Sequence, residues 1–266
     1  VNIWSGWRIQ SQVDRARAVH DSRRHGERIT RDEVAFLVVQ AYLNWMRLQA
    51  LVGLARDNVA MHERLSSDVS KIARVDEGRQ IDVTQAIVRT ENARLTLEQL
   101  SSEREIAAER LRRMLLGALP RHPSGYEKIA GELPATDKQL LAMITETHPV
   151  IAQQLAEIDA AKANVLNAKS GFSPTVDLSY QRQASQGTGQ GDYVTQLNVR
   201  VPIFDGGSAY GGTRSAYAEL DAAKQGLTEA KITLRENLLG AWSEYLTAKQ
   251  RMILGARQVK NALELV

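Results

Sequence analysis

Apolar residues recur at alternating steps of three and four through a long stretch without proline. Between Arg8 and Ala73 the chain has no proline, and its only glycines there are Gly26 and Gly53. The apolar positions are Val38, Ala41, Trp45, Leu48, Val52, Ala55 and Val59. Their mean spacing of about 3.5 residues is the period of a coiled-coil seam. The pattern predicts one helix over residues 8–73, roughly 100 Å long at 1.5 Å per residue.

A second seam follows a short interruption. Residues 74–80 break the pattern, with Gly78 as the expected turn residue, and Asp82 then opens the next helical segment. The seam positions are Val83, Ala86, Thr90, Ala93, Leu97, Leu100, Arg104, Ala107, Leu111 and Met114. Residues 8–115 are therefore predicted to form an antiparallel helical hairpin whose tight tip lies near residues 74–82.

The next segment changes character. Residues 116–149 hold four of the six prolines and have mixed polarity, which predicts a connector with a short helix around residues 138–147. A helix is expected over residues 150–172. From Ser208 a heptad pattern returns, so residues 204–266 are expected to form another long helix.

Between these helices the apolar period changes to two. Val176, Leu178 and Tyr180 alternate with polar residues in the segment 174–181, and a second alternating segment spans residues 193–203. The Gly-rich residues 185–192 supply a turn, so residues 174–203 are predicted to form a β-hairpin. Such strands fit either an ordinary ribbon packed on a soluble core or a transmembrane strand of about 9–11 residues. No other sheet is predicted, and an isolated hairpin is only marginally stable in water. Closure with strands of other copies would satisfy every edge.

The opening residues of the chain recur 200 positions later. Val-Asn-Ile-Trp-Ser-Gly-Trp at residues 1–7 corresponds to Val-Pro-Ile-Phe-Asp-Gly-Gly at residues 201–207. Further matches in the same ungapped register are Ala16 with Ala216, Ala18 with Ala218, Ala41 with Ala241, Tyr42 with Trp242, Trp45 with Tyr245, Met46 with Leu246 and Val59 with Val259. This predicts a duplicated unit. Its first copy would begin before Val1 and its second would end after Val266, so an internal piece of a longer protein is expected.

Composition limits the function classes. The chain is 43% hydrophobic but only 5% aromatic, which favours elongated packing over a rounded core. A net charge of +3, spread along the chain, does not favour a nucleic-acid partner. There is no cysteine, so disulfides and thiolate metal sites are excluded. No apolar run reaches the roughly 18 residues of a transmembrane helix.

No catalytic constellation is visible. The five histidines, His20, His25, His62, His122 and His148, have no metal-ligand spacing. There is neither a phosphate-binding loop nor a Gly-x-Ser-x-Gly elbow. We therefore predict no catalytic, cofactor-binding or metal site, and no enzyme activity. A soluble coiled-coil scaffold or a periplasmic adaptor remains the alternative class, although an adaptor should carry β-rich halves on both sides of a single helical hairpin.

Four short motifs carry a family resemblance. They are His-Pro-Val-Ile at 148–151, Ser-Gly-Phe-Ser-Pro at 170–174, Val-Pro-Ile-Phe-Asp-Gly-Gly at 201–207, and Gly-Arg-Gln-Ile-Asp-Val with a following Ala at 78–86. In their order, spacing and duplication, the whole chain resembles a TolC-type outer-membrane factor. Members of that family are the channel-tunnels of efflux pumps and type I secretion systems.

The resemblance implies a fold that is mainly α with a β-hairpin. In a homotrimer, each protomer would supply four strands to one transmembrane β-barrel and long antiparallel coiled-coil helices to a periplasmic tunnel. The protein would lie in the outer membrane, in contact with its lipid, with a large periplasmic part. A periplasmic adaptor (membrane fusion protein) and an inner-membrane transporter of the ABC or RND class would dock at the helical tips. Conduction would be passive, and the sequence does not specify the cargo.

The resemblance and the alternation together assign candidate site residues. The predicted lumen-facing residues of the barrel are Gln196, Asn198 and Arg200, and the predicted lipid-facing residues are Leu197, Val199 and Val201. The predicted barrel–tunnel junction consists of Gly6, Pro174, Pro202 and Gly206. Gly78 and Asp82 fall at the tunnel tip, where Asp82 either holds an aperture contact or acts as a cap or first-turn charge of its helix. The acidic gate of the family would fall near position 278, outside this sequence.

Overall fold

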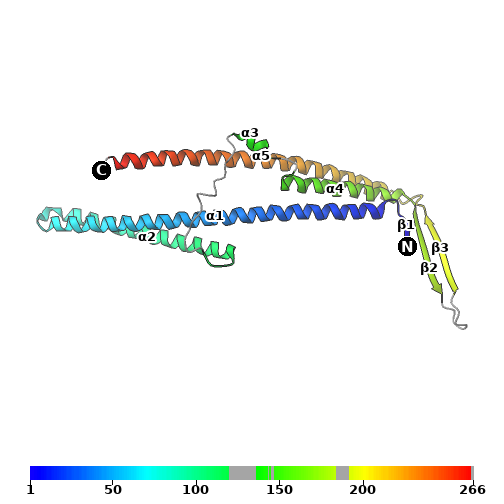
Figure 1. Ribbon diagram of the computed structural model, residues 1–266, viewed down its shortest axis with the longest axis horizontal. Coiled ribbons are helices and arrows are strands. Elements are labelled where there is room, and N and C mark those ends of the chain that lie inside the picture. The colour runs from blue at the N-terminus through cyan, green and yellow to red at the C-terminus, as the bar shows by residue number, and fades with distance from the viewer. Residues whose placement is uncertain (120–135, 143, 145–146, 184–191, 265–266) are drawn as a thin grey trace. The chain divides into compact units, whose positions relative to one another are not determined.

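The computed structural model describes residues 1–119, 136–142, 144, 147–183 and 192–264. These residues fall into two compact units, Val1–Thr30 with Pro134–Val266, and Arg31–Leu133 (Figure 1). The helices are α1 (Arg8–Ala73), α2 (Gln80–Leu115), α3 (Asp137–Ala142), α4 (Pro149–Lys169) and α5 (Ser208–Leu263), with the 3-10 turns η1 (Glu77–Arg79) and η3 (Ser170–Phe172). The strands are β1 (Asn2–Trp4), β2 (Thr175–Gln183) and β3 (Asp192–Arg200). The predicted mainly helical fold with one strand hairpin is confirmed.

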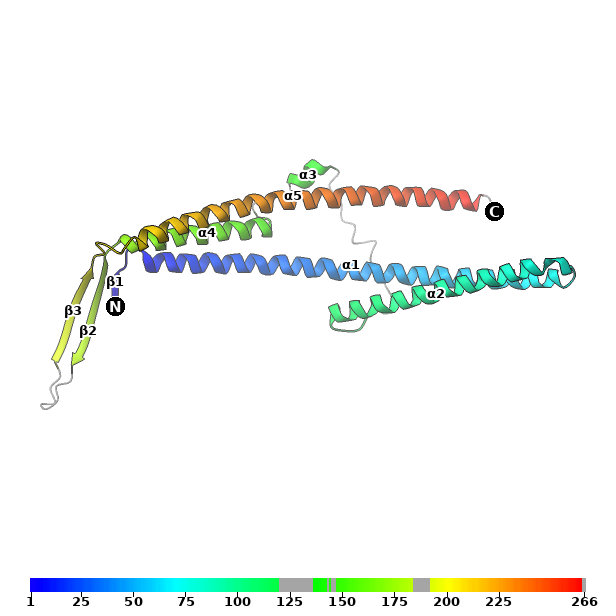
Figure 2. The same cartoon turned by 180° about the vertical axis from the view of Figure 1, so that it is seen from behind.

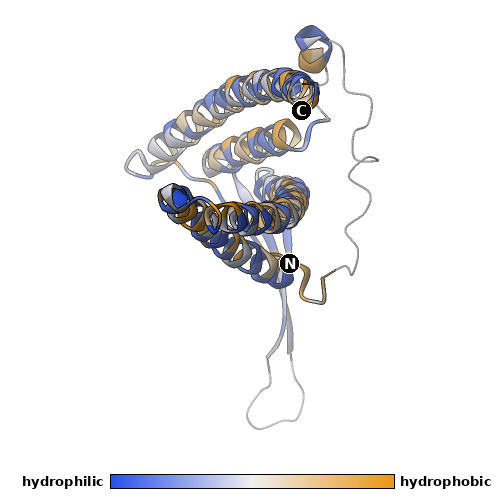
Figure 3. Ribbon diagram, turned by 90° about the vertical axis from the view of Figure 1, so that its left-hand side faces the viewer, coloured by the Kyte–Doolittle hydropathy of each residue, from blue (hydrophilic) through white to orange (hydrophobic). Residues whose placement is uncertain are grey.

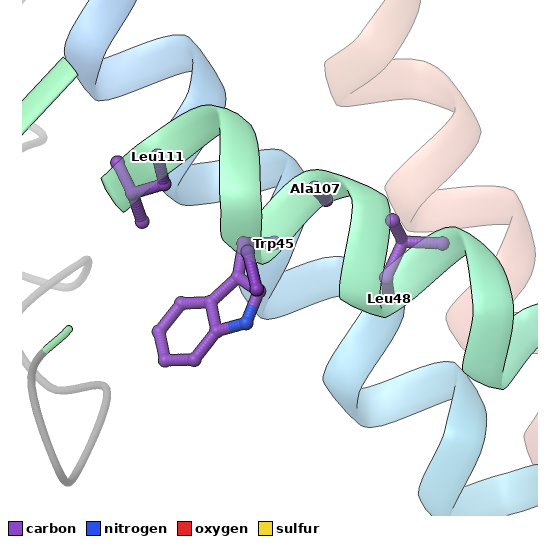
Figure 4. Packing of buried hydrophobic residues seen from close by; sticks show 5 residues of the cluster. Trp45, Leu48, Ala107 and Leu111 are labelled. Atoms are coloured by element: carbon purple, nitrogen blue, oxygen red, sulfur yellow. The ribbon is translucent and has the colours of Figure 1, made fainter. Parts of the chain in front are cut away.

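The unit Arg31–Leu133 is built on an antiparallel pair of helices. Trp45 and Leu48 of α1 are buried against Ala107 and Leu111 of α2 (Figure 4). Farther along the pair, Thr90 of α2 donates a hydrogen bond to the carbonyl of His62 at 3.3 Å. Seam positions of both heptad patterns, among them Trp45 and Leu111, therefore form the core of this unit, and small alanines let the helix backbones approach closely.

The turn between α1 and α2 contains Gly78 and is capped by Asp76. Gly78 lies inside η1 and does not have a positive φ, so no left-handed glycine makes this turn. Asp76 caps η1 instead, because its carboxylate accepts hydrogen bonds from the Gly78 amide at 3.2 Å and from Arg79 Nε at 3.2 Å. An aspartate at an extended position before a helical turn is a favoured N-cap, and this signal was overlooked in the sequence.

In the other unit α4 packs along the first half of α5 (Figures 1 and 2). Ile158 and Val165 of α4 are buried with Ala216 and Leu220 of α5. The first part of α1 also contacts α4, where Ser22 Oγ donates to Glu157 Oε1 at 3.3 Å. Polar and apolar residues mix around these helices, as the hydropathy colouring in Figure 3 shows. Each helix therefore buries only a narrow stripe.

Two glycines of the repeat meet adjacent glutamines of α4. A Cβ on Gly26 of α1 would lie 3.5 Å from Gln153 Nε2, and a Cβ on Gly226 of α5 would lie 3.0 Å from Gln154 Oε1. The helix α4 therefore has equivalent glycines of the two repeat copies beside consecutive residues. This arrangement supports the duplication inferred from the sequence.

The connector is only partly described. The short helix expected around residues 138–147 is observed as α3, Asp137–Ala142, and it contacts α5. Residues 120–135, 143 and 145–146 lie outside the described residues, as do 184–191, which hold most of the expected hairpin turn, and 265–266 at the end of the chain.

Candidate functional site: the strand hairpin and its junction with the helices

The hairpin has one apolar and one polar face. Residues directly opposite each other in an antiparallel pair project from the same face of the sheet. The register pairs Leu197 with Leu178 and Val199 with Val176, whereas Asn198 faces Asp177. The other polar pairs are Gln196 with Ser179 and Arg200 with Thr175. The register therefore gathers the three predicted lumen residues on one face, opposite polar partners, and places Leu197 and Val199 on the other.

The second strand ends earlier than predicted. The expected segment 193–203 ends as a strand at Arg200, so Val201 lies beyond β3. Pro202 accounts for this end, because proline has no amide hydrogen for the ladder and restricts the residue before it. Pro174 likewise precedes β2, which begins at Thr175. Both prolines flank the sheet at the same end, because Thr175 pairs with Arg200.

A third strand extends the hairpin. The strand order is β1-β2-β3, and β1 runs antiparallel to β2. Asn2 Nδ2 donates to Asp177 Oδ1 at 2.8 Å, and the Leu178 amide donates to the Val1 carbonyl at 2.8 Å. The start of the chain therefore pairs with a strand about 175 positions away, which no local sequence pattern indicates.

Aromatic side chains lie at both ends of the strands. The rings of Tyr180 and Tyr193 stack with centroids 5.5 Å apart, toward the far end of the hairpin. At the helical end, the rings of Trp4 and Trp7 meet edge to face at 5.3 Å. All four side chains are exposed in this chain. Amphipathic aromatic residues at both ends of an apolar strand face are typical of a membrane-spanning sheet.

The junction between sheet and helices is built twice. Helices α1 and α5 begin at Arg8 and Ser208, 200 residues apart, and both are preceded by two residues with positive φ. These residues are Gly6 and Trp7 in the first copy and Gly206 and Gly207 in the second, with φ values of 60°, 68°, 68° and 85° respectively. The duplicated sequence thus produces the same sharp turn from sheet to helix at both places.

Ser5 and Asp205, which are equivalent in the two repeat copies, each cap the helix that follows. Ser5 Oγ accepts a hydrogen bond from the Ile9 amide at 3.4 Å. Asp205 Oδ2 accepts one from the Ala209 amide at 2.6 Å, and its Oδ1 accepts another from Gly207 at 3.0 Å. Short oxygen-bearing side chains at these positions satisfy amides that the first helical turn leaves unpaired. The sequence comparison had aligned these two residues without assigning them this role.

At the tip, Asp82 lies in the first turn of α2. A carboxylate there is favourable beside the positive end of the helix dipole. Asp82 also lines a shallow groove with residues of both helices, among them Leu65, Ile72 and Arg89. Nearby apolar side chains point into solvent, with Val75 91% exposed.

None of the described helices is long and apolar enough to cross a membrane. Within the same residues, no three histidine, aspartate or glutamate side chains come together as a metal site.

Comparison with known proteins places these features in a family. Residues 140–266 match the family model "Outer membrane efflux protein". The chain is 24% identical over 239 residues to the cobalt-zinc-cadmium resistance protein CzcC of Cupriavidus metallidurans, covering 87% of this chain and 57% of CzcC. It is 25% identical over 265 residues to protein CyaE of Bordetella pertussis, covering 90% of this chain and 51% of CyaE.

Solved structures show the same fold. The open state of the Neisseria gonorrhoeae MtrE outer membrane channel superposes with a TM-score of 0.76 at 21% identity, over 98% of this chain and 61% of MtrE. The outer-membrane channel OprN gives a TM-score of 0.79 at 23% identity, over 94% of this chain and 58% of OprN.

This chain is similar to the TolC-type outer-membrane efflux proteins.

The resemblance read from the four motifs is thereby confirmed. The chain spans about half the length of the TolC-type relatives that it matches, with 57% of CzcC and 51% of CyaE covered. Within the TolC-type architecture, the hairpin with its two faces and the two helix junctions are the candidate functional elements of this chain.

Proposed function

We propose that this chain forms part of an outer-membrane channel-tunnel, a passive conduit that carries efflux or secretion cargo from the periplasm to the exterior. The protein would lie in the outer membrane, and its long helices would extend into the periplasm. The observation that carries this proposal is the hairpin, whose register separates apolar from polar side chains.

Strand length and exposure support a membrane position for the hairpin. Both β2 and β3 have nine residues, within the roughly 9–11 that a tilted strand needs to cross a bilayer. Leu197 is 62% exposed in the single chain, and Val199 is similarly exposed on the same face. Such a face is unfavourable in water but matches lipid. The opposite face, with Gln196, Asn198 and Arg200, would then line a water-filled lumen.

The sheet edges support assembly from several copies. Among the described strands, β3 has a partner on one side only, and β1 covers only three residues of β2's outer edge. Unpaired strand edges cannot remain in the hydrocarbon core of a membrane, so the sheet must close. A homotrimer with four strands per protomer, as in the TolC-type architecture, would close it.

The partner proteins would bind at the tip between α1 and α2. Ile81, Val88 and Arg89 form an open, partly apolar surface on the first turns of α2, together with Gln80, Thr84 and Gln85. A partly apolar helix face with a few polar groups is suited to a helical partner. A periplasmic adaptor would dock here, and an inner-membrane transporter of the ABC or RND class would supply the energy.

Single-cysteine labelling tests this proposal. The native chain has no cysteine, so residues 196–199 can be replaced one at a time without background reactivity. In outer-membrane preparations, cysteines at 196 and 198 should react with a water-soluble maleimide, and those at 197 and 199 with a lipid-soluble one. Uniform labelling by the water-soluble reagent, with the protein in a soluble fraction, would favour the coiled-coil scaffold instead.

A further inference from the structure

A groove lies where the first helix leaves the sheet, and the barrel proposal assigns it no role. It has a volume of about 470 Å³. Its walls are Gly6, Trp7, Gln10, Ser11 and Asp14 at the start of α1, and Leu166, Lys169, Ser170 and Ser173 at the end of α4 and the following turn. The groove therefore combines one ammonium group, several small polar groups and an apolar wall.

Trp7 is held in this groove in an unfavourable backbone conformation. Its φ is 68°, in the left-handed region where a bulky side chain is a genuine outlier. The equivalent residue of the second repeat copy is Gly207, which adopts this region without penalty. Trp7 is nevertheless 65% exposed, so the conformation does not serve to bury its indole. A strained and exposed residue is a reason to look for a ligand.

Lys169 supplies the positive charge of the groove. Its Nζ lies 5.2 Å from the centroid of the Tyr217 ring on α5, and this cation–π contact holds the long side chain near one position. The acidic member, Asp14, already accepts a hydrogen bond from Gln10 at 3.0 Å and pairs with Arg17 at 3.7 Å. These contacts partly compensate the negative charge of Asp14, so Lys169 remains the group that can bind an anion.

We propose that this groove binds the headgroup of a membrane phospholipid, with Lys169 at the phosphodiester, Trp7 beside the glycerol region and Leu166 against the start of an acyl chain. The proposal rests on the outer-membrane location proposed above. In that setting the groove lies at the foot of the strands, at the level where an indole is most stable in a bilayer. A free phosphate fits less well, because one lysine beside an apolar wall does not compensate the desolvation of a dianion.

Two substitutions separate the contributions, each with a matched control. Trp7→Gly removes the indole and places at position 7 the residue that its repeat equivalent already has, so the backbone turn is expected to persist. Lys169→Met removes the charge and keeps the aliphatic length. The controls are Trp242→Ala, which removes an indole on α5, and Lys162→Met, which removes an exposed lysine of α4 that pairs with Asp159 at 2.8 Å.

The measurement is native mass spectrometry of the membrane-extracted assembly, titrated with dioleoyl phosphatidylethanolamine. Each of the two groove substitutions should weaken lipid retention about tenfold, the effect of losing one charge-assisted contact or one indole contact. The control proteins should retain lipid as the parent does. Equal retention by all variants would overturn the proposal.

A competition experiment with inorganic phosphate distinguishes a phospholipid site from a site for a free anion. Inorganic phosphate at millimolar concentration should not displace the lipid from the parent protein, because the apolar contacts are absent. Full displacement would show a site for a free anion and would also overturn the proposal. Neither result affects the labelling test, so a protein that labels as a barrel but retains lipid equally in all variants would refute only the groove.

Discussion

Gly6 and Gly206 share a backbone conformation but not an environment. They stand 200 residues apart, with φ values of 60° and 68°. A Cβ built on Gly6 would lie 2.1 Å from the Cβ of Ser173, whereas one on Gly206 would meet no atom within 4 Å. The duplication has thus preserved the turn in both copies, and only the first copy has packed another segment against it.

This difference predicts unequal effects of alanine at the two positions. Gly206→Ala should lower the free energy of unfolding by about 1–2 kcal/mol, the penalty for a left-handed alanine. Gly6→Ala should lower it by more, because the added methyl group also collides with Ser173. Urea unfolding followed by circular dichroism measures both. Equal losses would mean that the η3 segment moves freely away from the turn.

A compensating substitution tests the collision itself. Ser173→Gly removes the side chain that a methyl group at position 6 would strike. In the background of Ser173→Gly, the further loss caused by Gly6→Ala should fall to about 1–2 kcal/mol, the value expected at Gly206. Undiminished loss in the double variant would place the obstacle elsewhere.

The seam of the helical hairpin should be sensitive to cavities. Leu111 has no exposed surface and packs with Trp45 and Leu48, so Leu111→Ala should destabilise the protein by about 2–5 kcal/mol. The control is Leu95→Ala on the same helix, because Leu95 is 68% exposed. That variant should stay within about 0.5 kcal/mol of the parent in the same unfolding measurement. Comparable losses at the two leucines would mean that another surface covers Leu95.

The tip turn should depend on Asp76 rather than on Gly78. Asp76→Ala removes the cap of η1 and should cost about 0.5–2 kcal/mol of stability. Gly78→Ala should be neutral or stabilising by up to about 1 kcal/mol, because the glycine has no positive φ and a Cβ would be 3.4 Å from the nearest Asp76 oxygen. Hydrogen exchange of the amides in residues 74–82 reads both effects locally. Faster exchange in Gly78→Ala would show that the turn depends on this glycine.

The helix caps formed by Ser5 and Asp205 should differ in strength. Asp205 accepts two backbone hydrogen bonds, whereas Ser5 accepts one long bond at 3.4 Å. Asp205→Ala should therefore destabilise the start of α5 by about 1–2 kcal/mol, and Ser5→Ala should cost less. Exchange rates of amides in the first turns of α5 and α1 compare the two directly. A larger effect of Ser5→Ala would contradict the assignment.

Periodicity predicted the elements because their residues make local or regularly spaced contacts. The 3.5-residue spacing around Trp45 predicted a helix over residues 8–73, the span that α1 occupies. The alternation around Leu197 predicted strands whose faces the register then separated. The offset between Gly6 and Gly206 aligned two turns that have the same φ.

Contacts between distant segments could not be predicted in this way. The pairing of Asn2 with Asp177 and the close approach of Ser173 to Gly6 depend on how separate segments meet in space. Gly78 lies in the turn between α1 and α2, but the periodicity gave no sign that Asp76 makes the stabilising contact there. The end of β3 at Arg200 was not predicted, because apolar and polar side chains continue to alternate beyond Arg200.

The apolar face of the hairpin also sets an order of events during biogenesis. The helical pair can bury its seam within one chain, but Leu197 and Val199 remain 62% and 59% exposed among the described residues. In the proposed outer-membrane assembly, a newly exported subunit would therefore have to cross the aqueous periplasm with an aggregation-prone strand ribbon before any lipid or neighbouring copy shielded it. In that assembly the helices would form first, and the sheet would mature last, when subunits met at the bilayer. Periplasmic holdase chaperones would accordingly act on this ribbon rather than on the helices.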